Sequence, residues 1–379
     1  MNIGICAPYD LARDGGVNSH IRAQARALQT LGHRVCIFGA ASTALHGGER
    51  RICDCISPVI GGTETGMGVD PRSWWRVGRL FDEERFDILH IHEPLMPIVP
   101  WCAVLQARAP IVATFHTHRE RGHRFYPRYR GLLAPLMQRI QVRLAVSHAA
   151  RQTVERTFPG AYELFPNGID IERFRVAAER PSLMHPGRRH VIAVGRLEPR
   201  KGLDHLVDAM AIVQRTRPDV RLLLVGDGPD REALRARAAT AGVDVLFAGR
   251  VSDTGLAAYY RAADLVCCAA TGGESFGIVL LEAMAAGRPL VATAIEGYLE
   301  LARDAEAVRF VPPGDAAAMA DAIGAWLDDA TLSARVGAAA PAFARQYDWA
   351  ALARQLEARY IALIGSTSQN ELAGPTAER

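Results

Sequence analysis

The stretch that decides the fold is Thr271-Gly-Gly-Glu-Ser-Phe-Gly-Ile-Val-Leu-Leu-Glu-Ala-Met-Ala-Ala-Gly-Arg-Pro289, a glycine-rich turn that runs into a short helix. Gly287 and Pro289 are predicted to end that helix, because neither residue continues one. The helix body is apolar on every side except at Glu282. An unpaired buried carboxylate is costly, so Glu282 is expected to have a buried partner or to bind a ligand.

A second carboxylate, Glu274, lies in the turn ahead of the helix. Gly272 and Gly273 let backbone N–H groups approach an anion at the helix N-terminus. Glu274 would repel a phosphate there unless it points elsewhere, for instance toward the hydroxyls of a sugar attached to that phosphate. The alternative is that Glu274 only caps the helix and is favoured by its dipole. The turn by itself leaves both readings open.

Length and composition narrow the class of protein. The chain has 379 residues and 49% hydrophobic content, which predicts two domains rather than one. It contains no run of eighteen apolar residues and no basic-then-apolar leader, so we expect a cytoplasmic protein. The seven cysteines are scattered and odd in number, which favours reduced thiols over a disulfide framework.

Charge is distributed unevenly along the chain. Residues 1–168 carry 20 Arg against 14 acidic residues, whereas the remainder has a small acidic excess. The first half is therefore the better candidate for an anionic surface or substrate. Lys201 is the only Lys among the 44 basic residues, which suggests that an ammonium rather than a guanidinium is needed there. The alternative is that this single Lys is present by chance and has no specific role.

Short apolar strands alternate with helical patterns through both halves. This pattern predicts an α/β fold of two Rossmann-like, doubly wound parallel sheets, with the two domains facing each other across a cleft. A hinge is expected over 167–189, which is rich in Pro and Gly. The strands are predicted at 2–7, 34–39, 86–92, 111–118 and 144–147, and then at 190–195, 220–226, 245–248, 265–268, 289–293 and 307–311.

Loops at the carboxyl ends of such strands are where ligands bind. Gly15 and Gly16 follow the first strand and open a helix, which is a weak signal for an anion-binding loop. Arg196 and Lys201 follow the first strand of the second half, where two cations suit a pyrophosphate and the charge that grows on it as it leaves. Asp253 follows a later strand and can accept two N–H bonds from guanine, which uracil cannot supply. Helix capping is the alternative for Asp253.

Four histidines lie near strand ends in the first half, as the pairs His90 and His92, and His116 and His118. A zinc site is an alternative to packing for these pairs, but no acidic or cysteine partner is spaced for it, and we expect no metal. His118 is predicted to be last on its strand and to open into the cleft, so it is the better candidate for contact with substrate. The chain has no Asp-x-Asp pair of the kind that chelates a nucleotide-bound metal.

Taken together, the motifs resemble the retaining family 4 glycosyltransferases of the GT-B fold, from about residue 1 to residue 365. They are Gly15-Gly16, His118, Asn167-Gly168, Gly195-Arg196 with Lys201-Gly202, and Gly273-Glu274 through Glu282. Within that family the chain most resembles the phosphatidylinositol α-mannosyltransferases, through Gly15-Gly-Val-Asn-Ser-His20, His90-Ile-His-Glu-Pro94, Ile111-Val-Ala-Thr-Phe-His-Thr117 and Tyr347-Asp-Trp349.

The resemblance implies a hexosyltransferase of glycolipid biosynthesis that needs no metal. Its donor is a nucleotide sugar, in the first place GDP-mannose, and its acceptor is a hydroxyl of a lipid such as phosphatidylinositol, or of a small molecule. The implied domains are an acceptor-binding domain over 1–168 and a donor domain over 169–348. A helix over 349–365 would cross back to the first domain, and 366–379 would form a disordered tail.

The resemblance also implies roles for individual residues. Those in catalysis are His118, Arg196, Lys201 and Glu274. Those that bind donor are Gly15, Gly16, Arg196, Lys201, Val251, Asp253 near guanine, Gly273, Glu274 on the sugar hydroxyls, Ser275, Phe276, Gly277, Ile278 and Glu282 on the ribose. Those that bind acceptor are Asp10, Asn18, His118, Arg119 and His123.

Two segments are basic and aromatic. Residues 119–130 depart from the small polar stretch typical of the inositol lipid enzymes, so they are candidates for binding either acceptor or membrane. Residues 70–81 have a composition suited to peripheral association with an anionic membrane, such as the inner face of the plasma membrane. An ordinary surface helix is the alternative, and no nucleic-acid signature accompanies either segment. The membrane-contact candidates in the second segment are Arg72, Trp74, Trp75, Arg76 and Arg79.

The mechanism follows from the spacing of the two carboxylates. Glu274 and Glu282 are expected to lie two helical turns apart, roughly 12 Å along the axis, too far for the carboxylate pair of a retaining glycosidase. The resemblance implies front-side attack instead, in which the departing phosphate takes the acceptor proton. The alternatives are a UDP-sugar-dependent transferase with another lipid or small-molecule acceptor, a sugar-nucleotide epimerase, and a non-catalytic binding protein.

Overall fold

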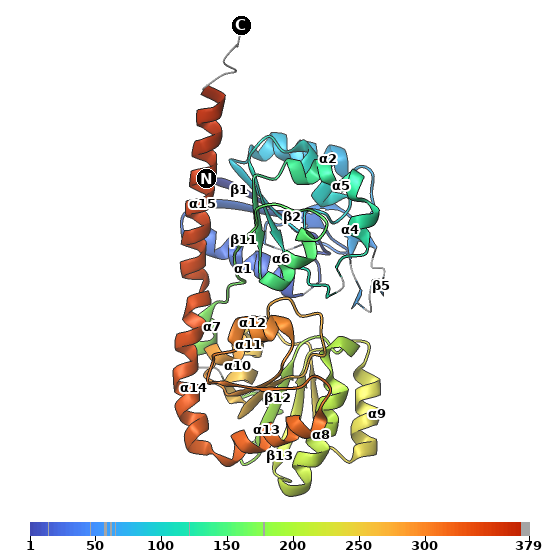
Figure 1. Cartoon of the computed structure of the whole chain (residues 1–379), viewed down its shortest axis with the longest axis vertical. Coiled ribbons are helices and arrows are strands. Elements are labelled where there is room, and N and C mark those ends of the chain that lie inside the picture. The colour runs from blue at the N-terminus through green and yellow to red at the C-terminus, as the bar shows by residue number, and fades with distance from the viewer. Residues whose placement is uncertain are drawn as a thin grey trace. The chain divides into compact units, whose positions relative to one another are not determined.

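The computed structural model describes residues 1–13, 15–45, 47–56, 59–60, 63–64, 66–120, 122–176 and 179–372 (Figure 1). The chain divides into two compact units. Unit 1 contains Met1–Gly168 together with the chain from Trp349 onward, and unit 2 is Ile169–Asp348. Within the described residues, no helix combines the length and the apolar character that a membrane span requires.

Unit 1 is built on a seven-stranded parallel sheet with the strand order β11-β10-β9-β8-β1-β2-β3. The order reverses between β1 and β8, which creates a crevice at the carboxyl ends of these strands where ligands bind in such sheets. β8 and β9 are buried along their whole length, as expected for a sheet covered on both faces. The strands are β1 Asn2–Cys6, β2 Arg34–Ala40, β3 Arg50–Cys53, β8 Ile88–His92, β9 Ile111–Phe115, β10 Val142–Ala145 and β11 Glu163–Leu164.

Helices cover both faces of this sheet. α1 Gly16–Thr30 and the C-terminal helix α15 Trp349–Leu372 pack together over one core, which includes Ile21, Leu28 and Leu356. α2 Ser73–Glu84, α3 Val99–Gln106 and α5 Arg130–Gln138 surround the other core. The remaining elements of unit 1 are α4 Phe125–Arg128, α6 His148–Glu155 and two antiparallel pairs, β4 Cys55–Ile56 with β7 Met67–Gly68 and β5 Val59–Ile60 with β6 Thr63–Glu64.

Unit 2 has a six-stranded parallel sheet with the order β14-β13-β12-β15-β16-β17, the Rossmann arrangement. Its strands are β12 Arg189–Val194, β13 Val220–Val225, β14 Val245–Gly249, β15 Leu265–Cys268, β16 Leu290–Thr293 and β17 Val308–Val311. Its helices are α7 Ile171–Arg175, α8 Leu203–Thr216, α9 Arg231–Ala241, α10 Asp253–Ala262, α11 Ile278–Ala285, α12 Glu296–Ala302, α13 Ala316–Asp328 and α14 Ala330–Ala344. The predicted fold class, with two Rossmann-like parallel sheets, is confirmed.

The structure differs from the sequence prediction at two element ends. β9 stops at Phe115 instead of His118, because the N–H groups of His116 and Thr117 donate to the Glu93 carboxylate and no longer continue the ladder. α15 continues to Leu372, so the tail predicted from residue 366 was wrong over 366–372. No proline interrupts that part of the helix, and residues 373–379 lie outside the described part of the chain.

Candidate active site

Two loops meet where the strand order of unit 2 reverses. The loop after β12 runs from Gly195 to Gly202, and the loop after β15 begins at Ala269. Gly202 has a left-handed φ of 58°, and a Cβ added there would lie 2.2 Å from the carbonyl oxygen of Ala269. Only glycine allows this approach. It brings the side chains of the two loops together at the carboxyl edge of the sheet.

Cations and carboxylates of these loops form one cluster. The Lys201 Nζ donates to Glu274 Oε1 at 2.6 Å, and an Arg200 N–H donates to the same oxygen. The Arg200 Nε also lies 2.6 Å from Glu198 Oε1, and the Arg196 Nε lies 3.6 Å from Glu198 Oε2. We call Arg196, Arg200 and Lys201 the cation cluster. Arg196 and Lys201 line one recess with the ends of β12 and β15.

The charge state of Glu274 follows from these contacts. Burial raises the pKa of Glu274, but Lys201 and Arg200 lower it more, so that the pKa lies below its ordinary value. Glu274 is therefore ionised and holds two of the three cations in place. Sequence reasoning missed Arg200, although its position beside Lys201 in a loop at a strand end was a usable signal.

The structure does not show the capping alternative for Glu274. α11 begins at Ile278, its N-cap is Gly277, and no side chain caps it. Gly277 is required there, because its φ is 93° and an added Cβ would lie 2.7 Å from Tyr298 Cδ1. Glu274 thus lies outside the helix. The separation expected between Glu274 and Glu282 assumed one continuous helix, and that assumption was wrong.

Glu282 lies on α11 and has the partner that its position in an apolar helix requires. The Tyr260 hydroxyl on α10 donates to Glu282 Oε2 at 2.8 Å. Burial raises the pKa of Glu282, and the hydrogen bond from Tyr260 and the charge of Arg173 oppose that effect. The Glu282 carboxyl is thereby oriented from within unit 2.

The other predicted donor residues of unit 2 fall into two places. At the start of α10, the N-cap is Ser252, whose Oγ accepts the Gly255 N–H, so capping is not the role of Asp253. The Asp253 side chain is 67% exposed and lies 3.6 Å from Arg173, next to the partly buried Val251. The second place is the segment that leads into α11. Of the predicted donor-binding residues there, Gly273 is exposed, Ser275 is partly buried, Phe276 and Gly277 are buried, and Ile278 is the first residue of the helix.

In unit 1, the predicted anion loop precedes α1. Gly15 is the N-cap of α1 and Gly16 its first residue, and both are exposed, with no atom within 4 Å of a Cβ added at either. Asp10 and Asn18 fold the same loop. Asp10 Oδ1 accepts the N–H groups of Ala12 and Ser42, and the Asn18 amide donates to the Asp10 and Arg13 carbonyl groups. Contact of Asp10 or Asn18 with an acceptor stays a prediction.

His118 is buried and follows β9 in an irregular segment, so its predicted place at the end of the strand was wrong. Its Nδ1 lies 3.3 Å from the Ala149 carbonyl oxygen. The backbone N–H of Arg119 donates to Thr153 Oγ1. The His123 ring stacks on Tyr126 with centroids 4.0 Å apart, and burial, together with the nearby Arg119, lowers the pKa of His123 to about 4.

The helix α2 carries the predicted aromatic membrane contacts. Trp74 and Trp75 are 44% and 69% exposed, against the expectation that aromatics of an ordinary surface helix lie in the core. Its three exposed arginines are all paired: Arg72 and Arg76 with Asp70, and Arg79 with Glu83.

A different surface is formed by α4 and the start of α5. It consists of the exposed residues Arg124, Arg128, Tyr129, Arg130 and Leu132, which we call the α4–α5 surface. Among the residues that the structure describes, no carboxylate forms an ion pair with these three arginines. Arg121 of the predicted basic segment lies outside the described residues. Positive charge on the α4–α5 surface is therefore uncompensated, unlike that on α2.

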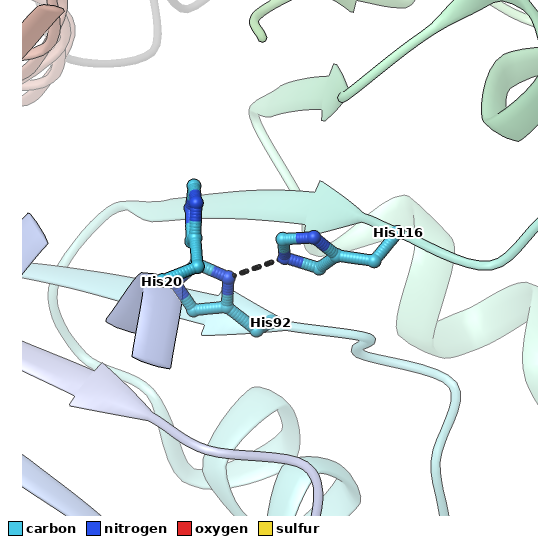
Figure 2. Close-up of side chains that lie close together, drawn as sticks. All are labelled: His20, His92 and His116. Atoms are coloured by element: carbon cyan, nitrogen blue, oxygen red, sulfur yellow. Dashed lines mark hydrogen bonds between the residues drawn. The ribbon is translucent and has the colours of Figure 1, made fainter. Parts of the chain in front are cut away.

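Three histidines of unit 1 converge from separate elements (Figure 2). His92 Nδ1 and His116 Nε2 are hydrogen-bonded at 2.8 Å, and the His20 ring centroid lies 5.5 Å and 5.0 Å from theirs. Burial lowers the pKa of His116 to about 3 and that of His20 and His92 well below the ordinary value. Sequence reasoning missed His20, because it lies on a helix and not at a strand end.

Comparison with known proteins identifies the family. The family model described as Glycosyltransferase Family 4 matches residues 14–173, and that described as Glycosyl transferases group 1 matches residues 177–343. The chain is 37% identical over 386 residues to the phosphatidyl-myo-inositol mannosyltransferase of Mycobacterium tuberculosis (strain ATCC 25618 / H37Rv), which covers 98% of this chain and 100% of that protein. The chain belongs to the phosphatidyl-myo-inositol mannosyltransferase family. It is a glycosyltransferase.

A further relative agrees with this assignment, and solved structures bear on the fold. The phosphatidyl-myo-inositol mannosyltransferase of Propionibacterium freudenreichii is 30% identical over 379 residues, with 95% of this chain and 94% of that protein covered. Anabaena HepE in complex with UDP and glucose superposes with a TM-score of 0.76 at 21% identity, covering 96% of this chain and 100% of that chain. Sucrose-phosphate synthase from Thermosynechococcus elongatus gives 0.75 at 23% identity, covering 96% and 99%. These structures show that the fold is GT-B.

Proposed function

We propose that the protein transfers a mannosyl group from GDP-mannose to a hydroxyl of phosphatidyl-myo-inositol, with retention of configuration and without a metal ion in the reaction. The names of the relatives support the acceptor and the sugar. The single observation that carries the proposal is the cation cluster of unit 2, which Glu274 and Glu198 hold at the edge of the sheet where the strand order reverses.

The donor pyrophosphate binds to the cation cluster. Lys201 and Arg196 line one recess, and their charges match a diphosphate. Both Lys201 and Arg200 bond to Oε1 of Glu274, and its Oε2 accepts a hydroxyl of the sugar. Arg200 thus acts as a positioning residue for Glu274. Glu282, oriented by Tyr260, accepts the ribose hydroxyls.

Carbohydrate chemistry at this site proceeds by front-side attack. The acceptor oxygen forms a bond to the anomeric carbon, the bond from that carbon to the β-phosphate oxygen breaks, and the hydroxyl proton passes to the departing phosphate. Glu274 is held by two cations and Glu282 by Tyr260, so neither carboxylate is presented as a free nucleophile. Arg196 and Lys201 stabilise the negative charge that develops on the leaving GDP.

Selection of the nucleotide rests on Asp253. Its carboxylate is exposed at the start of α10 and is not used in helix capping. It accepts the N1 and N2 hydrogens of guanine, a pair of donors that uracil lacks. Gly15 and Gly16 of unit 1 offer open backbone N–H groups at the start of α1, which suit an anion.

The acceptor is recognised by unit 1, with His118 close to the reacting hydroxyl. The lipid lies in an anionic membrane, and the α4–α5 surface attracts that membrane through its uncompensated arginines. Trp74 and Trp75 of α2 add aromatic groups suited to the interface. The reaction then takes place at the inner face of the plasma membrane, where the protein is peripheral.

Nucleotide release tests the proposal. GDP-mannose and UDP-glucose are each supplied with and without liposomes that contain phosphatidylinositol, in the presence of a metal chelator. GDP release that requires the inositol lipid and survives chelation is the expected result. Release from UDP-glucose, or release that does not depend on the lipid, would favour the second candidate, a UDP-sugar-dependent transferase with another acceptor.

A further inference from the structure

The histidine cluster of unit 1 is not used in the proposed reaction. His92 is the last residue of β8, His116 follows β9 by one residue, and His20 lies on the second turn of α1. His92 pairs in register with Thr114, so His92 and His116 project from the same face of the sheet, which α1 covers. Figure 2 shows the three rings turned toward one another. One ring nitrogen of each residue lies within 4.8 Å of the other two.

Two ring nitrogens of this cluster lack a partner. His20 Nδ1 and His92 Nε2 are buried and form no hydrogen bond, while the residues themselves are only 8% and 0% exposed. Unpaired polar atoms in a protein interior are costly and are rare without a function or a bound species. A third such atom is the indole N–H of Trp349, whose ring centroid lies 4.9 Å from that of His20.

Unpaired ring nitrogens are not shared by every buried histidine of this region, as His90 shows. His90 stacks on His92 with ring centroids 4.5 Å apart, yet both of its ring nitrogens have partners: Tyr360 and Gln24 at Nδ1, and Thr114 at Nε2. Of the stacked rings of His90, His92 and His116 and the adjoining ring of His20, the buried unpaired nitrogens belong to His92 and His20. His116 is further fixed through its backbone N–H, which donates to Glu93.

We propose that His20, His92 and His116 bind one divalent transition-metal ion of the zinc class. Neutral imidazole is a preferred ligand of Zn²⁺, and sites with three histidines leave the fourth position open for water or an anion. Tetrahedral coordination at a Zn–N distance of about 2.05 Å places ligand nitrogens about 3.4 Å apart. The ring nitrogens now lie within 4.8 Å of one another, and those of His92 and His116 are 2.8 Å apart, so the rings must rotate to reach the coordination distance.

Metal binding must rearrange one existing contact. The hydrogen bond between His92 and His116 uses one proton and two ring nitrogens, so at least one ring turns or exchanges its tautomer when the ion enters. Each neutral ring keeps one N–H and offers one lone pair, and no net proton is released. The ion then ties α1 to the ends of β8 and β9. The inference does not depend on the proposed sugar transfer, which requires no metal.

Cobalt binding tests the site directly. Protein without a polyhistidine tag is stripped with a chelator and titrated with Co²⁺, and the visible absorption is recorded. We expect one Co²⁺ per chain, the strong visible bands of four-coordinate cobalt, and loss of those bands when Zn²⁺ is added. Zinc at a hundred times its dissociation constant should also raise the Tm by about 5 °C.

Variants locate the ion. His20→Gln and His92→Gln should each weaken Co²⁺ binding by at least about a hundredfold and abolish the zinc-induced rise in Tm. The matched control is His148→Gln, an exposed histidine at the start of α6, which should bind as the wild type does. If His92→Gln fails to fold, His20→Gln decides. Equal binding by His20→Gln and wild type, or wild-type protein without four-coordinate cobalt bands, would overturn the site.

Discussion

The two sheets of this protein have the same kind of topology but opposite chemistry at their carboxyl edges. In unit 2, the edge carries Arg196, Arg200 and Lys201 around the carboxylates of Glu198 and Glu274. In unit 1, the corresponding edge carries buried, mutually packed histidines. Exposed arginines of unit 1 that form no ion pair with a described carboxylate include the three of the α4–α5 surface.

This difference between the two units matches the place at which each substrate of the proposed reaction carries its negative charge. A nucleotide diphosphate brings its negative charge to the reacting centre, so the cations must lie at the sheet edge of the unit that binds it. An inositol lipid reacts through a neutral hydroxyl and carries its charge in the membrane, so the cations are better placed on an outer surface. Shared topology therefore supports two functions through the side chains at the loops.

Removal of Lys201 should have the largest effect on activity, since it takes one of the three cations from the sheet edge of unit 2. Lys201→Ala should lower kcat/KM for GDP-mannose by about a thousandfold, because a fixed charge on the leaving phosphate is lost. Steady-state nucleotide release measures this. Lys201→Arg should restore only part of the activity, because a guanidinium does not replace the compact ammonium bonded to Glu274. Arg237→Ala, which removes an exposed pair with Asp208, is the control. Near-normal turnover by Lys201→Ala would refute the role.

Removal of positive charge from the α4–α5 surface tests the role of unit 1 in membrane binding. The triple change Arg124→Ser, Arg128→Ser and Arg130→Ser should reduce binding to anionic liposomes by about a hundredfold at low salt, since each cation contributes about 1 kcal/mol. Donor hydrolysis in the absence of lipid should not change. Liposome co-sedimentation measures the first quantity and nucleotide release the second.

A matched triple and a salt series separate charge from aromatic contact. Arg215→Ser, Arg235→Ser and Arg335→Ser make the same change in net charge on the exposed surface of unit 2 and should leave liposome binding nearly intact. High salt should abolish the contribution of the α4–α5 surface but spare that of Trp74 and Trp75 on α2. If the two triples behave alike, the α4–α5 surface has no special place in membrane binding.

A substitution at Asp253 tests how unit 2 selects the nucleotide base. Asp253→Asn should narrow the preference for GDP over UDP by about tenfold, the effect of losing charge-assisted hydrogen bonds at an exposed site. Competition of the two nucleotides with GDP-mannose measures the ratio. Asp321→Asn, an exposed position on α13, is the control. An unchanged ratio would remove Asp253 from base recognition.

The smallest effect should be on stability in acid. The pKa of Glu274 lies below its ordinary value of 4.5, because Lys201 and Arg200 outweigh the effect of burial. The contribution of Glu274 to the free energy of unfolding is therefore fully present above the ordinary pKa of 4.5. It is lost as the pH falls through the lowered pKa of Glu274. Urea unfolding from about pH 6 to about pH 4 and below should show a steeper loss for the wild type than for Glu274→Gln. Parallel curves would mean that the ion pairs contribute nothing to folding.

The strand and helix pattern was predictable because it depends on local periodicity. The strands Val220–Val225 and Leu265–Cys268 appear where the apolar runs placed them. The two-residue strands between Arg50 and Gly68 were not predictable, since they are too short for a period to be visible. The end of β9 was missed because a distant side chain, Glu93, takes over the N–H groups there.

The candidate site was predictable only in part. Lys201 was marked as the single Lys of the chain, and Glu282 as the single polar residue of an apolar helix. The contact of Arg200 with Glu274, and that of His20 with His116, join residues far apart in the sequence, so they depend on how loops and helices meet in the fold.

The most direct test of the central claim is the structure of the reaction product. GDP-mannose labelled with ¹³C in the sugar is incubated with the protein and liposomes of phosphatidylinositol, and the lipid is extracted for mass spectrometry and NMR. The account predicts phosphatidylinositol that carries one hexose, with the α configuration of the donor retained at the anomeric carbon. A β-linked product, or free mannose with unmodified lipid, would contradict it.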